Sequence, residues 1–388
     1  MNYLTIVFPL LIFFSGACGL VYEVVWVRLF TGVFGNTTYS VTAVLSAFMA
    51  GLALGSRLFG KAADRSKRPL MVYGLLEGGI GLSALAVTCL APLSQPVYSY
   101  LFNVFGFSDA LLTASRFAIS FFLMLVPSVF MGGTLPVMSR FYIRRLRQVG
   151  AKAGLLYGLN TLGATAGCFL AGFYLIEVFG VRGSVLLGVA VNIIIGILSL
   201  VLGRTAAGVM AKPSVDTPGT APPVRAGAAG TGPSRLVFLA LVALAGFTSL
   251  SYEVLWTRLL VFKLKTTVYA FSSMLTTFLL GIGLGGVLFS AVERRFKKIN
   301  YVKMWAALQG GIAVTGFASI VIFGVFEKLP FAASTATGWT GKVVYTNFLP
   351  SLAIMLLPTL LMGLAFPAAV AAGTERIERL GSSVGTVY

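Results

Sequence analysis

The sequence predicts an all-α protein that crosses a membrane about ten times, and three observations support this fold class. Of its 388 residues, 57% are hydrophobic and only 10% are charged, whereas soluble proteins carry about 25% charged residues. The shortage of charge extends along the whole chain, which excludes a soluble enzyme with a single anchor. Ten apolar runs follow one another, and each reaches the roughly 20 residues that a membrane-spanning helix needs.

Each apolar run is expected to form one spanning helix. The runs cover approximately residues 4–33, 38–60, 70–93, 111–139, 153–179, 183–203, 236–262, 267–290, 302–326 and 346–373. The first run has no charged segment before it and continues well beyond the length of a signal sequence. We therefore interpret it as a helix of the mature protein.

Basic residues gather after every even-numbered run, while the other loops are poorer in them apart from Lys263 and Lys265. Because cytoplasmic loops carry an excess of Lys and Arg, we expect the N-terminus and all the basic loops in the cytoplasm. The net charge of +18 is therefore interpreted as membrane topology and not as nucleic-acid binding. The clusters are Lys61, Arg65, Lys67 and Arg68; Arg140, Arg144, Arg145, Arg147 and Lys152; Arg204, Lys212, Arg225 and Arg235; Arg294, Arg295, Lys297, Lys298 and Lys303; and Arg376 and Arg379.

Residues 205–234 divide the chain into two parts. This segment is rich in Ala, Gly and Pro and has no apolar period, a composition typical of a flexible linker, here expected in the cytoplasm. Residues 1–204 then form a first unit of six predicted helices, and residues 235–388 form a second unit of four.

The two units repeat the same sequence motifs at an offset of about 230 residues. The pairs are SGACGLVYEVVWVRLF and AGFTSLSYEVLWTRLL, AGLALGSRLFG and LGIGLGGVLFS, LLEGGIG and ALQGGIA, and PSVFMGGTLPVMSR and PTLLMGLAFPAAVA. An even number of spans before the linker predicts parallel repeats, the plan of major facilitator transporters. Because Tyr157 aligns with Tyr388, the second repeat is expected to be incomplete and the chain to be truncated.

Several site chemistries are excluded by composition. The chain has no His, so His-ligated zinc, His-ligated haem and Ser–His or Cys–His nucleophile pairs cannot form. The three cysteines stand alone in apolar runs, which gives neither a metal site nor a disulfide framework. We expect no catalytic residue, no metal and no cofactor in this chain.

The repeated motifs resemble a known family. The patterns G-L-x-Y-E-V-x-W-x-R-L, T-T-Y/V-Y, M-G-G-T-L-P and Y-x-x-N-T-L-G-A look like the membrane half of the fused MFS/spermidine synthase proteins. The resemblance implies a bacterial cytoplasmic (inner) membrane protein, with helical repeats followed by a cytoplasmic spermidine synthase-like domain. No stretch of this chain alternates strands and helices, so the aminopropyltransferase activity is assigned to none of its residues. Whether the protein acts as an enzyme is left open.

Two acidic residues, Glu23 and Glu253, lie in apolar runs and are related by the repeat. A carboxylate beside an aromatic face suits an organic cation such as a polyamine, and two such positions could hold both ends of a diamine. A structural ion pair with Arg28 or Arg258 of the neighbouring repeat is the alternative. The shared neighbours in this substrate-binding hypothesis are Tyr22 and Trp26 in the first repeat and Tyr252 and Trp256 in the second.

A third intramembrane acid, Glu77, has Gln309 as its counterpart in the second repeat. One titrating member in a pair of this kind would suit a proton-coupling or cation-binding role. A hydrogen-bonded packing role is the alternative.

Other motifs point to conformational change. The segment 60–68, with Asp64 and Arg65, resembles the major facilitator loop in which an Asp caps a helix and pairs with Arg as a latch. A solvated basic loop is the alternative. Within the runs, Gly132, Gly133 and Pro136 in the first repeat and Pro367 in the second are expected to bend helices around a binding cavity, although simple helix packing uses the same residues.

Together these features predict a membrane module that binds or transports polyamines or similar organic cations. Its expected partners are the lipid bilayer, a polyamine or organic cation and a cytoplasmic spermidine synthase-like domain, and no nucleic acid. Two alternatives stay open: a membrane anchor for an aminopropyltransferase, and a structural subunit of a membrane complex.

Overall fold

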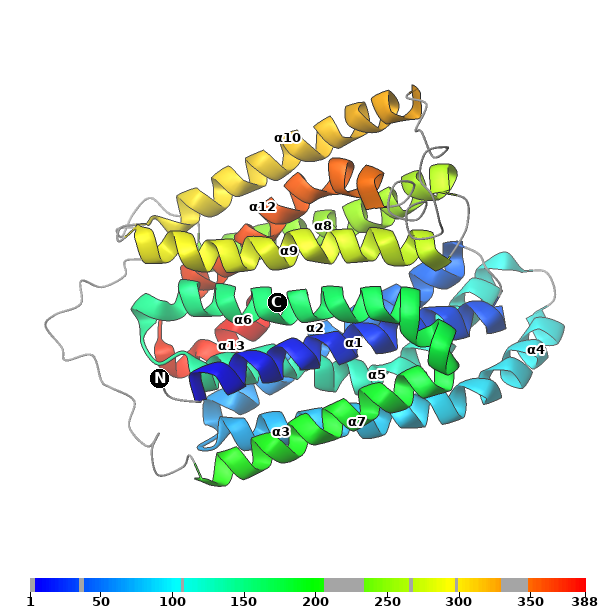
Figure 1. The fold of residues 1–388 in the computed structure, drawn as a ribbon, viewed down its shortest axis with the longest axis horizontal. Helices are drawn as coiled ribbons and strands as arrows, with labels where there is room; N and C mark the ends of the chain where they lie inside the picture. The colour runs from blue at the N-terminus through cyan, green and yellow to red at the C-terminus, as the bar shows by residue number, and fades with distance from the viewer. Residues whose placement is uncertain are drawn as a thin grey trace, which may run out of the picture.

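The protein is all-helical over the part described by its computed structural model, which confirms the predicted all-α class there (Figure 1). The described residues are 4–34, 38–105, 108–205, 234–264, 268–296, 299–328 and 348–388. No strand occurs among them. The predicted linker lies almost wholly in residues 206–233, outside the described ranges.

Apart from a short helix over residues 94–105, which the sequence analysis did not predict, the helices before the predicted linker follow the predicted runs. They are α1 (Leu4–Phe34), α2 (Thr38–Arg65), α3 (Pro69–Leu90), α4 (Ser94–Phe105), α5 (Asp109–Tyr142), α6 (Val149–Leu170) and α7 (Ile176–Thr205), with short turns η1 (Ala91–Leu93), η2 (Leu146–Gln148) and η3 (Ala171–Leu175). Pro69 opens α3 at a position where its missing N–H has no helical partner to lose.

The helices after the predicted linker keep the same order. They are α8 (Arg235–Leu264), α9 (Val268–Arg295), α10 (Tyr301–Lys328), α12 (Leu349–Gly373), η5 (Ile377–Arg379) and α13 (Leu380–Val387). By sequence alignment α8, α9, α10, α12 and α13 correspond to α1, α2, α3, α5 and the start of α6. This order is what a repeat would produce, and the two-repeat plan itself stays a prediction.

Eight segments of the described chain are long and apolar enough to cross a membrane, which is compatible with a multi-pass membrane protein. The ten predicted runs differ from this number for two reasons. The helix α2 is not among the eight, and the side chains of its first residues, 38–44, lie outside the described part of the protein. The two runs after residue 146 form one helical segment, Leu146–Thr205, of 60 residues. The backbone of that segment leaves helical geometry at Gly180, with φ of 68°.

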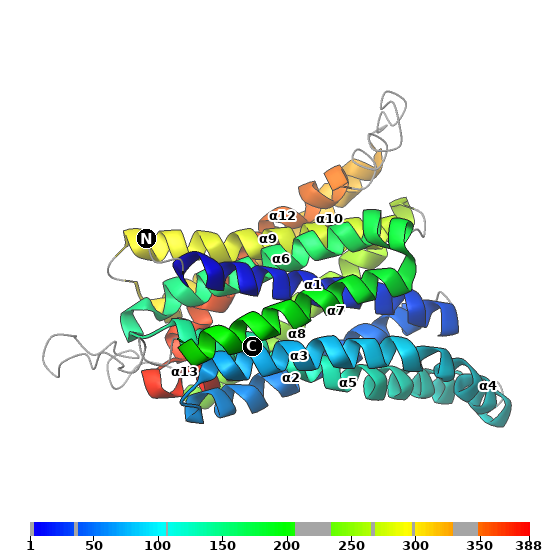
Figure 2. The same cartoon turned by 60° about the horizontal axis from the view of Figure 1, so that its bottom comes forward.

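The break at Gly180 lets the chain reverse. An unbroken helix of that length would extend roughly 90 Å, three times the hydrocarbon thickness of a bilayer. Instead α6 and α7 lie on either side of α1 and both pack against it (Figures 1 and 2). Each therefore has the length of a single crossing.

Two seams join the helices before and after the predicted linker: α6 packs against α9, and α2 packs against α13 (Figure 2). Glycine permits both approaches, because small residues let helix backbones come close. A β-carbon added at Gly381 would meet the Gly60 backbone, and one added at Gly286 would meet Gly158. The glycine-rich repeat segments, residues 50–60 and 280–290, are thus helix-packing faces.

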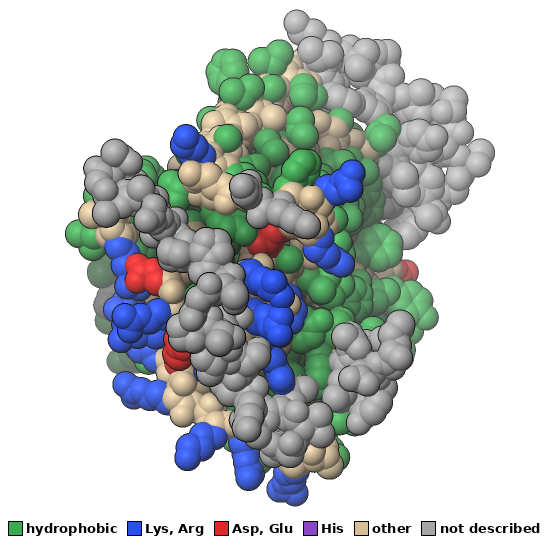
Figure 3. Space-filling view, turned by 90° about the vertical axis from the view of Figure 1, so that its left-hand side faces the viewer, with side chains coloured by type: hydrophobic (Ala, Val, Ile, Leu, Met, Phe, Trp, Pro, Cys, Tyr) green, Lys and Arg blue, Asp and Glu red, His purple; other side chains and the backbone are tan. Residues whose placement is uncertain are grey.

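Basic side chains gather at one end of the bundle (Figure 3). This end is the left-hand side of Figure 1, where α6 and α10 begin. Basic residues after every second spanning helix should all lie at the same end of the bundle, and the grouping agrees with this expectation. The cytoplasmic orientation of this end remains a prediction.

Candidate functional site

A cavity of about 380 Å³ lies between the helices before and after the predicted linker. It is bounded by α1, α2 and α6 on one side and by α8, α9, α10, α12 and α13 on the other. Glu23 on α1 and Glu253 on α8 both line it, and their exposed fractions are 2% and 4%. The structure therefore brings the two predicted acidic residues to one site.

The cavity wall carries acidic groups without basic ones. None of the residues that line the cavity in the described chain is Lys or Arg. Arg28 and Arg258 are exposed, and the described residues contain no ion pair between them and the buried acids. The Oε1 atom of Glu23 is buried without a hydrogen-bond partner in the described part of the protein. A buried carboxylate without a partner is unfavourable, so this site suits a positively charged ligand.

The remaining wall is mostly apolar with a few polar side chains. Leu, Ile, Met, Val, Ala and Phe side chains cover most of it, which suits an aliphatic chain. The other side chains at the wall are Tyr157, Asn160, Thr161, Ser249, Trp305, Gln309 and Tyr388.

The predicted tryptophans do not line the cavity. Trp26 stacks on Tyr22 with ring centroids 5.6 Å apart, and Trp256 stacks on Tyr252 with centroids 5.0 Å apart. Both indoles lie in the protein core, with exposed fractions of 0% and 2%. At i+3 from the glutamate, the indole points to one side of the cavity and packs behind a phenylalanine of the next helix.

Sequence reasoning missed the aromatic side chains that do face the cavity. Tyr157 lies on α6 and Tyr388 follows α13, and the Phe366 ring contacts both, with centroids 4.2 Å from Tyr157 and 5.8 Å from Tyr388. The sequence did contain an indication of these residues, because Tyr157 and Tyr388 align in the internal repeat. These rings take the place at the wall that the sequence assigned to Trp26 and Trp256.

Glu77 lies outside the cavity lining in a buried hydrogen-bond network. Its Oε1 accepts a bond from the Ser15 hydroxyl at 2.5 Å, and its Oε2 accepts one from the Asn192 amide at 2.6 Å. Asn192 accepts in turn from the Tyr22 hydroxyl at 2.7 Å. The counterpart of Glu77, Gln309, does line the cavity. The two positions thus have different surroundings.

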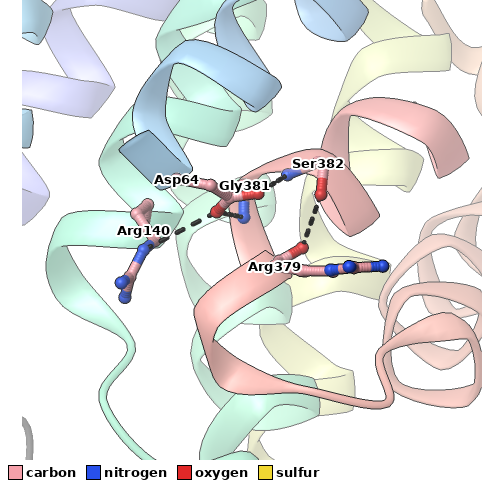
Figure 4. Close-up of polar contacts among 5 residues, drawn as sticks. All are labelled: Asp64, Arg140, Arg379, Gly381 and Ser382. Carbon is pink, nitrogen blue, oxygen red and sulfur yellow. Dashed lines mark hydrogen bonds and ion pairs between the residues drawn. The ribbon is translucent and has the colours of Figure 1, made fainter. Parts of the chain in front are cut away.

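Asp64 lies at the end of α2 and caps the start of α13 (Figure 4). Its Oδ1 accepts the N–H of Gly381 at 2.7 Å, and its Oδ2 accepts the N–H of Ser382 at 2.8 Å. Arg140, in the last turn of α5, places Nε 3.6 Å from Oδ1. A carboxylate at a helix N-terminus satisfies free N–H groups and complements the helix dipole. The neighbouring Arg65 is exposed.

The glycines and prolines predicted to bend helices lie at packing contacts. A β-carbon at Gly132 would meet the α2 backbone, and one at Gly133 would meet the Phe59 ring. Pro136 lies within α5 and Pro367 within α12, and both helices continue through these residues. None of these four residues is among those that line the cavity.

No family model matches the chain. The chain is 24% identical over 195 residues to polyamine aminopropyltransferase 1 of Streptomyces coelicolor. The match covers 50% of this chain and 33% of that relative, so the chain spans about a third of the relative's length. The protein is therefore similar, over half of its sequence, to a part of a polyamine aminopropyltransferase.

Proposed function

We propose that this chain is the membrane module of a fused MFS/spermidine synthase-like protein, and that it binds and moves polyamines or similar organic cations. The observation that carries the proposal is the presence of Glu23 and Glu253 in one cavity whose described lining has no basic residue. The similarity to a polyamine aminopropyltransferase gives independent support for a polyamine as the ligand.

The chemistry of the wall matches a linear amine. Protonated amines form strong charge-assisted hydrogen bonds with carboxylates, and the two glutamates belong to helices on opposite sides of the cavity. The apolar side chains between them would contact methylene groups, and the rings of Tyr157 and Tyr388 offer faces to an ammonium group. A diamine or triamine would satisfy both carboxylates at once.

Movement of the ligand would require the seams between the proposed repeats to open. The cap from Asp64 to α13 joins α2 to a helix that follows the proposed linker, so it would hold one arrangement of the two repeats. In this proposal the module lies in the bacterial cytoplasmic membrane with its N-terminus in the cytoplasm. It would pass polyamines to or from a cytoplasmic spermidine synthase-like domain.

Binding of putrescine and spermidine to purified protein tests the proposal. Calorimetry should show binding to the unaltered protein and its loss in the double variant Glu23→Gln, Glu253→Gln. Glu177→Gln is the matched control, because Glu177 is an exposed acid in α7 and should leave affinity unchanged. Equal affinity in the double variant and the control would refute the proposed site.

A membrane anchor for an aminopropyltransferase is the second candidate, and the name of the relative favours it. In that case the helices would hold a catalytic domain at the membrane and the cavity would bind nothing. The reading frame beyond codon 388 tests this candidate. A Rossmann-like domain encoded there, together with no polyamine binding by the membrane part, would favour the anchor.

A further inference from the structure

A chain of buried hydrogen bonds connects three helices behind the cavity wall. Glu77 on α3 is fully buried and accepts bonds from Ser15 on α1 and from Asn192 on α7. Asn192 is also fully buried and accepts a bond from the Tyr22 hydroxyl on α1. None of these four residues lines the cavity. The network therefore joins α1, α3 and α7 without using the ligand site itself.

Tyr22 transmits this attachment to the cavity, because it directly precedes Glu23 on α1. The Tyr22 ring stacks on Trp26 with an interplanar angle of 15°. A β-carbon added at Gly188 of α7 would press on the same ring. The bonded hydroxyl and the packed ring of Tyr22 fix the rotation of α1 about its own axis. In this orientation Glu23 lies at the cavity wall.

The second acidic position lacks such a hydrogen-bond chain. Its tyrosine ring is packed in the same way, because Tyr252 stacks on Trp256 and a β-carbon added at Gly316 would press on Tyr252. The Nε1 of Trp256 also donates to the Ser319 hydroxyl. Within the described residues the Tyr252 hydroxyl makes no side-chain hydrogen bond, and Gln309, the counterpart of Glu77, lines the cavity. In the most apolar segment of α8, 11% of the residues are buried, whereas in that of α1 the share is 67%. The two positions therefore differ in two respects, the hydrogen bond of the tyrosine hydroxyl and the burial of the helix that carries the glutamate.

We infer that Glu77, Asn192 and Tyr22 are positioning residues that hold Glu23 ready for a cation, so that Glu23 is the primary ligand-binding carboxylate and Glu253 the secondary one. This inference rests on the proposed function. A side chain that is already ordered loses less entropy on binding, which corresponds to about threefold to tenfold in affinity per side chain.

The matched pair Tyr22→Phe and Tyr252→Phe tests the inference by calorimetry with spermidine. Tyr22→Phe should raise the dissociation constant about threefold to tenfold, and Tyr252→Phe should change it less than twofold. Likewise, Glu23→Gln should weaken binding more than Glu253→Gln. Equal effects within either pair, with binding intact in the unaltered protein, would overturn the inference and leave the proposed function standing.

Two substitutions of Glu77 separate positioning from other roles. Glu77→Gln keeps an acceptor for Asn192, and its amide N–H can donate to the Ser15 oxygen in a bond of reversed direction, so spermidine affinity should stay near that of the unaltered protein. Glu77→Leu removes both bonds and should resemble Tyr22→Phe. A loss as large in Glu77→Gln would show that the charge itself is needed, and a lower melting temperature without any change in affinity would show a purely structural role. Either result overturns the inference, and absence of spermidine binding in the unaltered protein overturns it together with the proposed function.

Discussion

Removal of the Asp64 carboxylate should loosen the start of α13 by an amount that the structure allows to be worked out. The carboxylate accepts two N–H groups, those of Gly381 and Ser382, and an Ala in its place accepts neither. Loss of a helix N-cap destabilises by about 0.5–2 kcal/mol. The partly exposed pair with Arg140 adds about 0–1 kcal/mol. Asp64→Ala should therefore favour local opening by about 0.5–3 kcal/mol, and Asp64→Asn, which keeps one acceptor oxygen, by about 1 kcal/mol.

Amide hydrogen exchange measured by mass spectrometry reports this opening directly. A change of about 0.5–3 kcal/mol corresponds to exchange about 2- to 150-fold faster at Gly381 and Ser382. Backbone amides of α5 should change little, because Asp64 contacts that helix through the Arg140 side chain and accepts no backbone N–H from it. Glu375→Ala is the control, since Glu375 is an exposed acid a few residues before α13. Unchanged protection of α13 in Asp64→Ala, or equal acceleration in the control, would refute the assignment of Asp64 as its cap.

Two further predictions concern packing, and thermal unfolding of purified protein checks both. Trp256→Phe removes the bond from Nε1 to the Ser319 hydroxyl, at 3.1 Å, and should lower stability by about 0.5–1.5 kcal/mol. Trp26→Phe should lower it less, because Trp26 Nε1 has no partner among the described residues. Equal losses of stability in the two variants would contradict this prediction. Gly158→Leu should destabilise the protein by about 1–3 kcal/mol or more, because the new side chain pushes α6 away from α9. Gly310→Leu is the control and should be close to neutral, because a β-carbon there meets open space. Unchanged stability in Gly158→Leu would show that α6 and α9 pack less closely than described.

The helical class and the approximate helix positions could be predicted from the sequence, because composition and the length of apolar runs decide them. The meeting of Glu23 and Glu253 in one cavity was a hypothesis drawn from the internal repeat, and the structure places both at the wall. These features depend on local composition or on two matching segments. Neither requires knowledge of how distant helices pack.

Features that depend on packing between distant helices could not be predicted. Periodicity places Trp26 near the face of Glu23, but the position of α2 decides that the indole lies behind the cavity wall. The bond between Glu77 and Asn192 joins residues 115 apart in sequence, and nothing local to either residue indicates it. Tyr157 was noticed as a match to Tyr388, yet only the fold shows that both rings face the cavity.

The glycine contacts between α2 and α13 and between α6 and α9 have a consequence for motion. Side chains that interlock make one helix resist sliding past another, because each must change rotamer before it can move. At Gly60 with Gly381, and at Gly158 with Gly286, backbone meets backbone, and few side chains lie close to either contact. Few side chains would therefore have to change rotamer when the helices rotate slightly about these glycine contacts. In the proposed transport, the bonds from Gly381 and Ser382 to the Asp64 carboxylate would then be among the contacts that such a rotation must break.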